Sequence, residues 1–494
     1  MKSNNIFGIG RFWWFVLASL LLGLLVALLS GSLQFHKKLN PEVTLGEFKL
    51  HMDEMIPSMM GTFEIPGCSI SLVMDGDIVW SKAYGYADVD SGRRLTTDTS
   101  MSVQSITKSL TAWGIMKLVE NGFLELDVPV SKYLNNWRFP KTDYDVGNVT
   151  VRALLSHTAG MPLGDFTDVY APGEELPPIT EKLTKEAILT HESGTKFSYS
   201  NVGYHLLELL VEEVTGRRFA DFMLSEVLVP MGMDSSYFEI DDSLDEFPPT
   251  GYDLEGNPVP VYLYPMKSSG GLFATAEDIA RFAAAGLDVN PVLSFENVSQ
   301  MYASESRSIG LYGMVFDAYG FGHYVETLPN GMLSVSHGGQ GKGIMTHFQV
   351  VPETGDAIVI LTNSQRSWPF ISFVLAEWAR WRNFPSVGMG KIGWGRYAMS
   401  GLIGMLLSAS LVTIMGLIPV YRQRKSTVIQ IVKIIVALIL IGVLLWCANQ
   451  PYLFIASVFP ILSLWLGVSV LVFSISLVLS VLLAESRRTR VRLD

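Results

Sequence analysis

The chain has 494 residues, of which 49% are hydrophobic and 17% are charged, and this balance excludes a mainly disordered protein. Its 36 basic and 47 acidic side chains give a formal net charge of −11, which argues against a nucleic-acid-binding protein. The two cysteines, Cys68 and Cys447, exclude a disulfide framework and a four-cysteine zinc site. The eight histidines lack the spacing of a metal site, so the sequence predicts no metal and no cofactor.

The first apolar run, residues 12–31, has 20 uncharged residues and is long enough to cross a hydrocarbon core of roughly 30 Å. Lys2 and Arg11 precede it, as in a signal sequence. The run exceeds the roughly 7–15 apolar residues of a cleavable signal. We therefore expect residues 1–39 to form an uncleaved signal anchor, with cleavage at residues 30–32 as the alternative. Either form exports the chain that follows.

Residues 40–385 have the composition of a soluble domain that is large enough for its own core. β-rich runs at 68–74 and 78–85 flank Asp-Gly-Asp at 75–77, which predicts a hairpin with an Asp-Gly turn. Residues 105–120 are apolar on nearly every face, so this segment is expected to be a buried helix.

Asn-Gly at 121–122 ends that helix, and the apolar pattern predicts two more helices at 202–214 and 219–227. Strands thus occupy both ends of the domain, with helices between them. We therefore expect an α+β fold in which both ends complete one antiparallel sheet around a helical insertion. The late β-rich runs are 333–336, 345–351 and 357–361.

The C-terminal segment, residues 386–494, predicts three transmembrane helices. Residues 397–421 are uncharged, and the 51 uncharged residues of 434–484 suffice for two helices. Asn-Gln-Pro at 449–451 is the natural turn between these two. The three helices are expected at about 397–421, 429–448 and 453–484.

With the N-terminal run these helices make four spans, which return both termini to one side of the membrane. The short basic segments then all face the cytoplasm, in agreement with the positive-inside rule. We expect a multi-pass plasma-membrane protein with an extracytoplasmic middle domain and the lipid bilayer as a partner. The basic residues are Lys2, Arg11, Arg422, Arg424, Lys425, Arg487, Arg488, Arg490 and Arg492.

Three short motifs in the middle domain carry chemistry, and the first is Ser-Ile-Thr-Lys at 105–108. A helix would place Ser105 and Lys108 on one face, one turn apart. A serine needs a base to become a nucleophile, and burial would lower the pKa of the lysine toward that role. Residues 193–196 match the same pattern but lie in a glycine-containing loop.

The second motif is Tyr-Ser-Asn at 199–201. Beside a cationic lysine, the Tyr199 phenol would ionise more easily and relay a proton. The Asn201 amide would hold an acyl group or the lysine. Tyr-Leu-Asn at 133–135 competes with this motif, in an apparent loop.

The third motif is His-Gly-Gly-Gln at 337–340, after a predicted strand. Its glycines would let a substrate approach the strand edge closely. Backbone N–H groups from this strand and from Ser105 would form an oxyanion hole. His-Thr-Ala-Gly at 157–160 is superficially similar, but it is interpreted as a loop.

These motifs occur in one order and in matching surroundings, and the middle domain resembles the class C β-lactamase, penicillin-binding protein and esterase-type serine hydrolases. The resemblance spans about residues 52–366. The other matching stretches are Ile-Pro-Gly at 65–67, Tyr-Gly-Tyr-Ala-Asp at 84–88, Leu-Leu-Ser-His-Thr-Ala-Gly-Met-Pro at 154–162 and Ser-Gly-Gly-Leu-Phe-Ala-Thr at 269–275.

The resemblance implies that Ser105 is the acylated nucleophile and that Lys108 and Tyr199 share the acid–base work. It also implies an oxyanion hole formed by the backbone N–H groups of Ser105 and Gln340. The residues that it implies for substrate positioning are Asn201, His337, Gly338 and Gly339.

True β-lactamases have Lys-Thr-Gly where this chain has His-Gly-Gly at 337–339. His337 is expected to be mostly neutral near pH 7, so it would not attract a substrate carboxylate as a fixed cation does. We therefore expect hydrolysis of amide bonds in D-amino-acid-containing peptides or N-acyl-D-amino-acid prodrugs. The three C-terminal helices add a resemblance to membrane-tethered prodrug-activating peptidases. An esterase and a cell-wall D-Ala-D-Ala carboxypeptidase or penicillin-binding protein are alternatives.

An alternative from another class is a catalytically silent sensor that binds peptides or wall fragments and signals through its helices. The intact set of Ser105, Lys108 and Tyr199 argues against it, because a pure binding protein does not need these groups. Independent transport is disfavoured, because the C-terminal helices hold almost no charge apart from Lys433 near the cytoplasmic edge.

Overall fold

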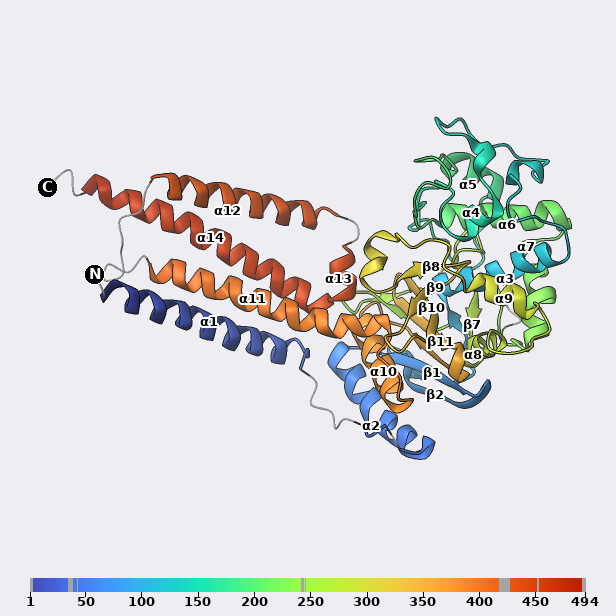
Figure 1. The fold of residues 1–494 in the computed structure, drawn as a ribbon, viewed down its shortest axis with the longest axis horizontal. Helices are drawn as coiled ribbons and strands as arrows, with labels where there is room; N and C mark the ends of the chain where they lie inside the picture. The colour runs from blue at the N-terminus through green and yellow to red at the C-terminus, as the bar shows by residue number, and fades with distance from the viewer. Residues whose placement is uncertain are drawn as a thin grey trace. The chain divides into compact units, whose positions relative to one another are not determined.

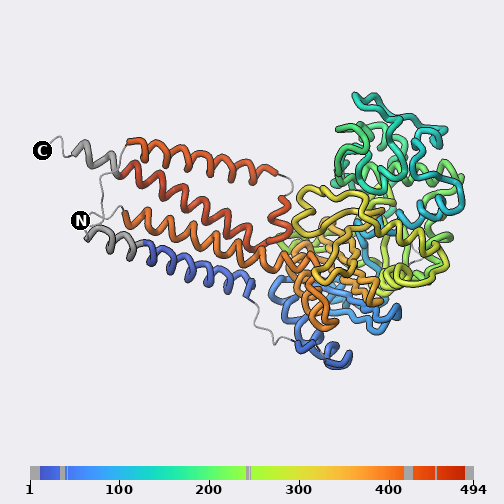
Figure 2. Tube along the Cα trace, in the orientation of Figure 1, coloured from blue at the N-terminus to red at the C-terminus, as the bar shows by residue number. Residues whose placement is uncertain are grey.

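The computed structural model divides the chain into two compact units (Figures 1 and 2). We call Lys38–Gly390 the sheet unit, and we call Met1–Lys37 together with Lys391–Asp494 the helical unit. The structure describes residues 3–33, 39–41, 43–240, 244, 246–416, 427–450 and 453–490, without the side chains of 3–11 and 484–490.

An antiparallel sheet forms the centre of the sheet unit (Figure 1). Its strand order is β3-β2-β1-β12-β11-β10-β9-β8. Strands from the two ends of the domain meet at the β1–β12 pair, where Ile70 lies opposite Ile360. The predicted α+β fold with a sheet completed by both ends is therefore confirmed. The strands are β1 (Gly67–Met74), β2 (Asp77–Asp88), β3 (Arg93–Arg94), β8 (Ala318–Tyr319), β9 (Tyr324–Thr327), β10 (Leu333–Gly341), β11 (Ile344–Val351) and β12 (Asp356–Thr362).

The β1–β2 hairpin turns at Asp75 and Gly76, whose φ angles are 52° and 83°. Two successive positive φ angles are the backbone of a type I′ turn, which matches the twist of the flanking strands. Glycine adopts this conformation without a Cβ clash, and aspartate tolerates it. The predicted Asp-Gly hairpin is confirmed.

Helices cover both faces of the sheet. Alternate residues of a strand point to opposite faces, so apolar residues at successive positions need cover on both sides. On one face, Val359 of β12 joins the core that includes Phe282 of α8 (Ala276–Ala285). Ile360, the next residue of β12, is equally buried and points to the other face. The sheet therefore has no open face at its centre.

Two helices from opposite ends of the domain, α2 (Leu45–Phe63) and α10 (Trp368–Trp381), pack together beside the sheet (Figure 1). The ring of Phe48 stacks on that of Trp381 with centroids 4.0 Å apart. α2 contacts β2 and α10 contacts β12, so this pair ties the two ends of the domain to the sheet.

The predicted helical insertion is present, with two differences at its helix ends. Helix α3 begins at Thr107, two residues later than predicted, because Gln104–Ile106 form a 3₁₀ turn that begins with a φ angle of +54° at Gln104. The helix predicted at 219–227 is α7 followed by a π-helical turn, Leu224–Leu228, before Pro230, which has no N–H to donate. The helices and short strands are α3 (Thr107–Glu120), α4 (Val151–Leu155), α5 (Ile179–Glu186), α6 (Asn201–Thr215), α7 (Phe219–Met223), α9 (Phe295–Met301), β4 (Met101–Ser102) with β7 (Phe273–Ala274), and β5 (Gly251–Tyr252) with β6 (Pro258–Val259).

Among the residues that the structure describes, four helices are long and apolar enough to cross a membrane, which suggests membrane association. The spans are Phe12–Leu29, Gly388–Met415, Thr427–Ala448 and Pro460–Leu483. The helices that hold them are α1 (Ser3–Leu29), α11 (Lys391–Met415), α12 (Thr427–Ala448) and α14 (Pro460–Arg490), with the short α13 (Phe454–Val458) before α14.

Helices α1 and α11 approach closely because glycines face each other. A Cβ at Gly404 would lie 2.4 Å from the backbone oxygen of Ser19, and one at Gly23 would lie 3.1 Å from that of Ser400. Small residues at such a contact allow the close van der Waals packing that holds helices together in lipid.

Two helices differ at their ends from the approximate spans that the sequence predicts. The helix expected from residue 397 already begins at Lys391. The helix expected at 453–484 is interrupted at Phe459, because the residue before Pro460 is pushed out of the helical conformation. The end of the predicted 397–421 helix, at 417–421, lies outside the described residues.

Several predictions fall on residues that the structure does not describe. These are Pro451 of the predicted turn, the basic residues Lys2, Arg422, Arg424, Lys425 and Arg492, and the side chains of Arg11, Arg487, Arg488 and Arg490. Lys433 is described, and its Nζ donates to Ser480 Oγ at 2.6 Å, from α12 to α14. Both cysteines are free, so no Cys68–Cys447 bridge exists.

Candidate active site

Ser105 and Lys108 lie together at the start of α3. Ser105 occupies the 3₁₀ turn and is partly exposed, whereas Lys108, in the first turn of the helix, is fully buried. The distance between Lys108 Nζ and Ser105 Oγ is 3.2 Å. Burial lowers the pKa of Lys108 well below its usual 10.5, because the charged ammonium loses its hydration. An amine that has lost its proton can accept one from the serine hydroxyl.

A second contact holds the Lys108 amine from the other side. Its Nζ donates to the carbonyl oxygen of Ser269 at 2.6 Å. The rings of Tyr199 and Tyr204 are also near, with centroids 5.1 Å and 5.7 Å from Nζ. The amine is thus fixed between the serine hydroxyl, a backbone carbonyl and two aromatic rings.

Tyr199 reaches the same serine from the loop before α6. Ser105 is near enough to its phenol to lower the phenol's pKa, although burial has the larger and opposite effect. The predicted easier ionisation of this phenol is wrong, because burial raises the pKa of Tyr199 well above 10. Burial also disfavours the charged form of Lys108, so it weakens the positive charge that was expected beside this phenol. Tyr199 is therefore a proton donor at neutral pH.

Asn201 is the first residue of α6, two residues after Tyr199. Its backbone N–H donates to the carbonyl oxygen of Leu163 at 3.0 Å. Ser200 caps the helix, because its Oγ accepts from the N–H of Gly203 at 2.9 Å. These contacts fix the backbone of the second motif beside the 3₁₀ turn of Ser105.

The third motif lies on β10, directly against the 3₁₀ turn. A Cβ at Gly339 would lie 2.3 Å from the carbonyl oxygen of Val103, so only glycine permits this approach. A Cβ at Gly338 would instead lie 2.7 Å from the ring of Trp368, on the opposite face. The Gln340 side chain accepts from Trp368 Nε1 at 3.1 Å and so lies on that opposite face too.

His337, on β10, is buried. Its Nε2 lies 3.2 Å from the Tyr319 hydroxyl, and its Nδ1 lies 2.8 Å from the carbonyl oxygen of Gly338. Burial first, and the nearby Lys108 second, lower the pKa of His337 well below 6.5. His337 is therefore neutral at pH 7 and provides no fixed positive charge.

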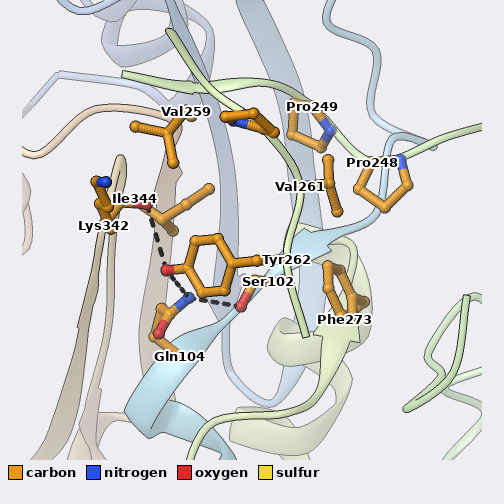
Figure 3. Close-up of a pocket in the computed structure, with 12 residues that line it drawn as sticks. Ser102, Gln104, Pro248, Pro249, Val259, Val261, Tyr262, Phe273, Lys342 and Ile344 are labelled. Atoms are coloured by element: carbon orange, nitrogen blue, oxygen red, sulfur yellow. Dashed lines mark hydrogen bonds between the residues drawn. The ribbon is translucent and has the colours of Figure 1, made fainter. Parts of the chain in front are cut away.

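Sequence reasoning missed Gln104, which precedes the serine. This residue holds a left-handed φ of 54°, a conformation that costs a non-glycine residue of the order of 1 kcal/mol. Its amide nitrogen donates to Ser102 Oγ at 2.8 Å and to the Tyr262 hydroxyl at 3.3 Å, and its amide oxygen accepts from the Tyr264 hydroxyl at 3.0 Å. Figure 3 shows Gln104 and Tyr262 at the base of a small pocket that Lys342 and several prolines and valines line.

Sequence reasoning also set His157 aside as part of a competing motif. The structure places this buried histidine behind Tyr199, with ring centroids 4.4 Å apart. Its Nδ1 accepts from the N–H of Ser200 at 3.2 Å. A φ of 58° at His157 marks a bend that the pattern Ser-His-Thr-Ala-Gly does not reveal by itself.

The competing motifs lack these arrangements. Ser193 and Lys196 lie in turns before Tyr199, with Lys196 exposed, whereas Lys108 is buried in a helix. Tyr133 follows a 3₁₀ turn, and its hydroxyl accepts from the N–H of Glu125 at 3.0 Å. The structure therefore groups Ser105, Lys108 and Tyr199 and leaves the competitors in loops.

Comparison with known proteins identifies the family. Residues 52–371 match the model of the Beta-lactamase family, and the chain belongs to this family. Protein flp of Staphylococcus aureus is 28% identical over 323 residues, which are 63% of this chain and 62% of that protein. The chain thus spans less than two thirds of the length of that relative. Penicillin-binding protein 4 of Amycolatopsis lactamdurans is 27% identical over 343 residues, 66% of this chain and 88% of that protein.

A solved structure shares the fold as well. The octameric penicillin-binding protein homologue from Pyrococcus abyssi is 28% identical and superposes with a TM-score of 0.57, covering 68% of this chain and 78% of that one. The family match and these relatives confirm the resemblance seen in the sequence. The chain therefore has a β-lactamase fold and is related to penicillin-binding proteins.

Proposed function

We propose that the protein is a membrane-anchored hydrolase that forms an acyl-enzyme on Ser105 and cleaves amide bonds next to D-amino acids. The observation that carries the proposal is the buried amine of Lys108, 3.2 Å from Ser105 Oγ and with its pKa lowered by burial. That arrangement supplies a neutral base to a serine, which nucleophilic catalysis requires.

In the proposed first step, Lys108 accepts the hydroxyl proton of Ser105 while Oγ attacks the substrate carbonyl carbon. The backbone N–H groups of Ser105 and Gln340 stabilise the charge on the carbonyl oxygen. As the carbon–nitrogen bond breaks, Tyr199 gives its phenol proton to the leaving nitrogen, and the ammonium of Lys108 returns a proton to Tyr199. Water then attacks the ester in the reverse proton sequence and releases the acid.

The proposed substrate class follows from charge. His337 is buried, its ring nitrogens contact Tyr319 and the Gly338 carbonyl, and its pKa is lowered, so the third motif offers no cation to a substrate carboxylate. An uncharged amide, as in an N-acyl-D-amino-acid prodrug or an internal peptide bond, suits this environment better than a free terminal carboxylate. Asn201 and the Gly338–Gly339 backbone are proposed to position that substrate.

A second candidate is a cell-wall D-Ala-D-Ala carboxypeptidase or penicillin-binding protein. The observation in its favour is that two of the relatives above are named a penicillin-binding protein and a penicillin-binding protein homologue. The electrostatics of His337 count against it, and an esterase is the remaining alternative. Labelling with a penicillin, which mimics the D-Ala-D-Ala end, separates this candidate from the first.

The test uses purified full-length protein, its Ser105→Ala variant and its Ser193→Ala variant. Each receives N-acyl-D and N-acyl-L amino-acid amides, D-Ala-D-Ala peptides and short-chain esters, and products are identified by mass spectrometry. We expect the wild type and Ser193→Ala to cleave acyl-D amides, and Ser105→Ala to lose at least about 1,000-fold in rate.

Ser193→Ala is a matched control, because Ser193 belongs to the competing Ser-x-x-Lys pattern. Retained turnover by Ser105→Ala would overturn the assignment. Cleavage of D-Ala-D-Ala peptides alone, together with penicillin labelling, would favour the carboxypeptidase. Cleavage of esters alone would favour the esterase, and no covalent adduct with any acylating probe would favour the silent sensor.

A further inference from the structure

A loop at residues 267–271 lies directly behind the Lys108 amine. The carbonyl oxygen of Ser269 accepts from Lys108 Nζ at 2.6 Å, a shorter distance than the 3.2 Å to Ser105 Oγ. The position of this carbonyl therefore decides where the amine lies relative to the serine. The three chemical motifs contain none of the residues of this loop.

The loop is held by a carboxylate from α6. One oxygen of Glu208, Oε2, accepts from the backbone N–H groups of Lys267 and Ser268, both at 2.8 Å. Glu208 is only 5% exposed and stands in the apolar run Leu-Leu-Glu-Leu-Leu. Burying a carboxylate costs stability, and here burial raises the pKa of Glu208 to about 7.

A histidine one turn earlier on α6 holds the same loop. His205 Nε2 lies 2.9 Å from Ser269 Oγ, and burial lowers the pKa of His205 to about 3, so the ring is neutral. Residues i and i+3 of a helix lie side by side. His205 and Glu208 therefore contact consecutive residues of the loop from one helix face.

We propose that Glu208 and His205 are positioning residues that orient Lys108 for catalysis by fixing the Ser269 carbonyl. The proposal rests on the proposed function of Lys108 as the base. Neither residue touches substrate, and both act through the loop. Tyr204 and Thr111 complete the support, because Ser268 Oγ donates to the Tyr204 carbonyl at 2.9 Å and Thr111 Oγ1 donates to the Ser268 carbonyl at 2.8 Å.

The test measures kcat, KM and the pH profile of full-length Glu208→Leu and Glu208→Gln on the substrate that Ser105 turns over. Leucine cannot accept the two N–H groups, so we expect kcat to fall about 10- to 100-fold with KM within about twofold. Glutamine keeps one acceptor oxygen and should restore most of kcat.

The pH profile separates positioning from a loss of stability. A carbonyl that accepts from Lys108 stabilises the ammonium, so its displacement should lower the pKa of the base. We expect the acid limb of kcat/KM to move to lower pH in Glu208→Leu. Ser269→Ala removes only the hydroxyl near His205 and should shift the acid limb less, in the same direction. If Glu208→Leu does not fold, this variant tests the positioning role by itself.

Asp278→Asn is the matched control. Asp278 is also a buried carboxylate that holds a loop, since it accepts from the N–H of Ser235 at 3.0 Å, but it lies on α8. We expect a lower Tm with an unchanged acid limb. A wild-type kcat and acid limb in Glu208→Leu and Ser269→Ala would overturn the positioning role. Turnover by Ser105→Ala would instead show that the proposed function has failed.

Discussion

At Lys108, burial disfavours the charged form of the side chain and lowers its pKa well below 10.5. Between that lowered pKa and 10.5 the unfolded chain binds more protons than the folded chain, so the free energy of unfolding rises with pH. Methionine fills the same space without this penalty. We therefore expect Lys108→Met to abolish turnover and to raise Tm at pH 7 by about 2 °C or more, measured by thermal unfolding in detergent.

The gain in Tm from Lys108→Met should shrink as the pH approaches 10.5, because the unfolded lysine then loses its proton as well. Lys196→Met serves as the control, since Lys196 is exposed and belongs to the competing motif. A lower Tm in Lys108→Met, or a gain that does not depend on pH, would show that the amine is not held neutral in the folded protein.

The sequence predicted the pairing of Ser105 with Lys108, because both lie within one turn of chain and local geometry decides their distance. It predicted the wrong direction for the pKa of Tyr199, since burial of the phenol in the folded domain raises that pKa. The role of Gln104 could not be predicted from the sequence. Its left-handed backbone goes with side-chain contacts to Tyr262 and Tyr264, which lie far along the chain. Glu208 offered one usable signal, a single acid within a run of leucines.

Among the elements, β10 depends on a glycine at its contact with the 3₁₀ turn. A Cβ at Gly339 would lie 2.3 Å from the Val103 carbonyl oxygen and 2.2 Å from Thr346 Oγ1. We expect Gly339→Ala to move β10 away from Ser105 and to lower kcat/KM by about 100-fold. Gly61→Ala, in α2 with open space around it, is the control and should leave the rate unchanged. A fully active Gly339→Ala would mean that this contact does not shape the site.

Element types were predicted better than element ends. β10 runs from Leu333 to Gly341, although the sequence indicated a strand only as far as Ser336. Glycines have low strand propensity, but pairing with β11 continues residue by residue through Gly341. The start of α3 was placed too early for a similar reason, since the 3₁₀ turn packs against β10, a partner from far along the chain.

At the scale of the molecule, the order of strands and helices along the chain sufficed to predict that both ends of the domain share one sheet. Antiparallel strands need only find partners of matching apolar pattern, and β1 and β12 are both almost fully buried. The four apolar helices could also be predicted from the sequence, because length and hydropathy decide whether a helix is able to span lipid. The pocket beside Gln104 was not accessible to sequence reasoning, since its walls come from segments far apart in the chain.

The proposed topology makes a prediction for intact cells. Cys68 is fully buried and will not react, so a Cys447→Ser chain is a silent background for introduced cysteines. Val289 is 92% exposed on the sheet unit, and Arg424 lies in the basic segment between the second and third apolar runs. Because short basic segments stay in the cytoplasm, we expect a membrane-impermeant thiol reagent to label Val289→Cys in intact cells. Arg424→Cys should be labelled only after permeabilisation. The reverse pattern would place the sheet unit inside the cell.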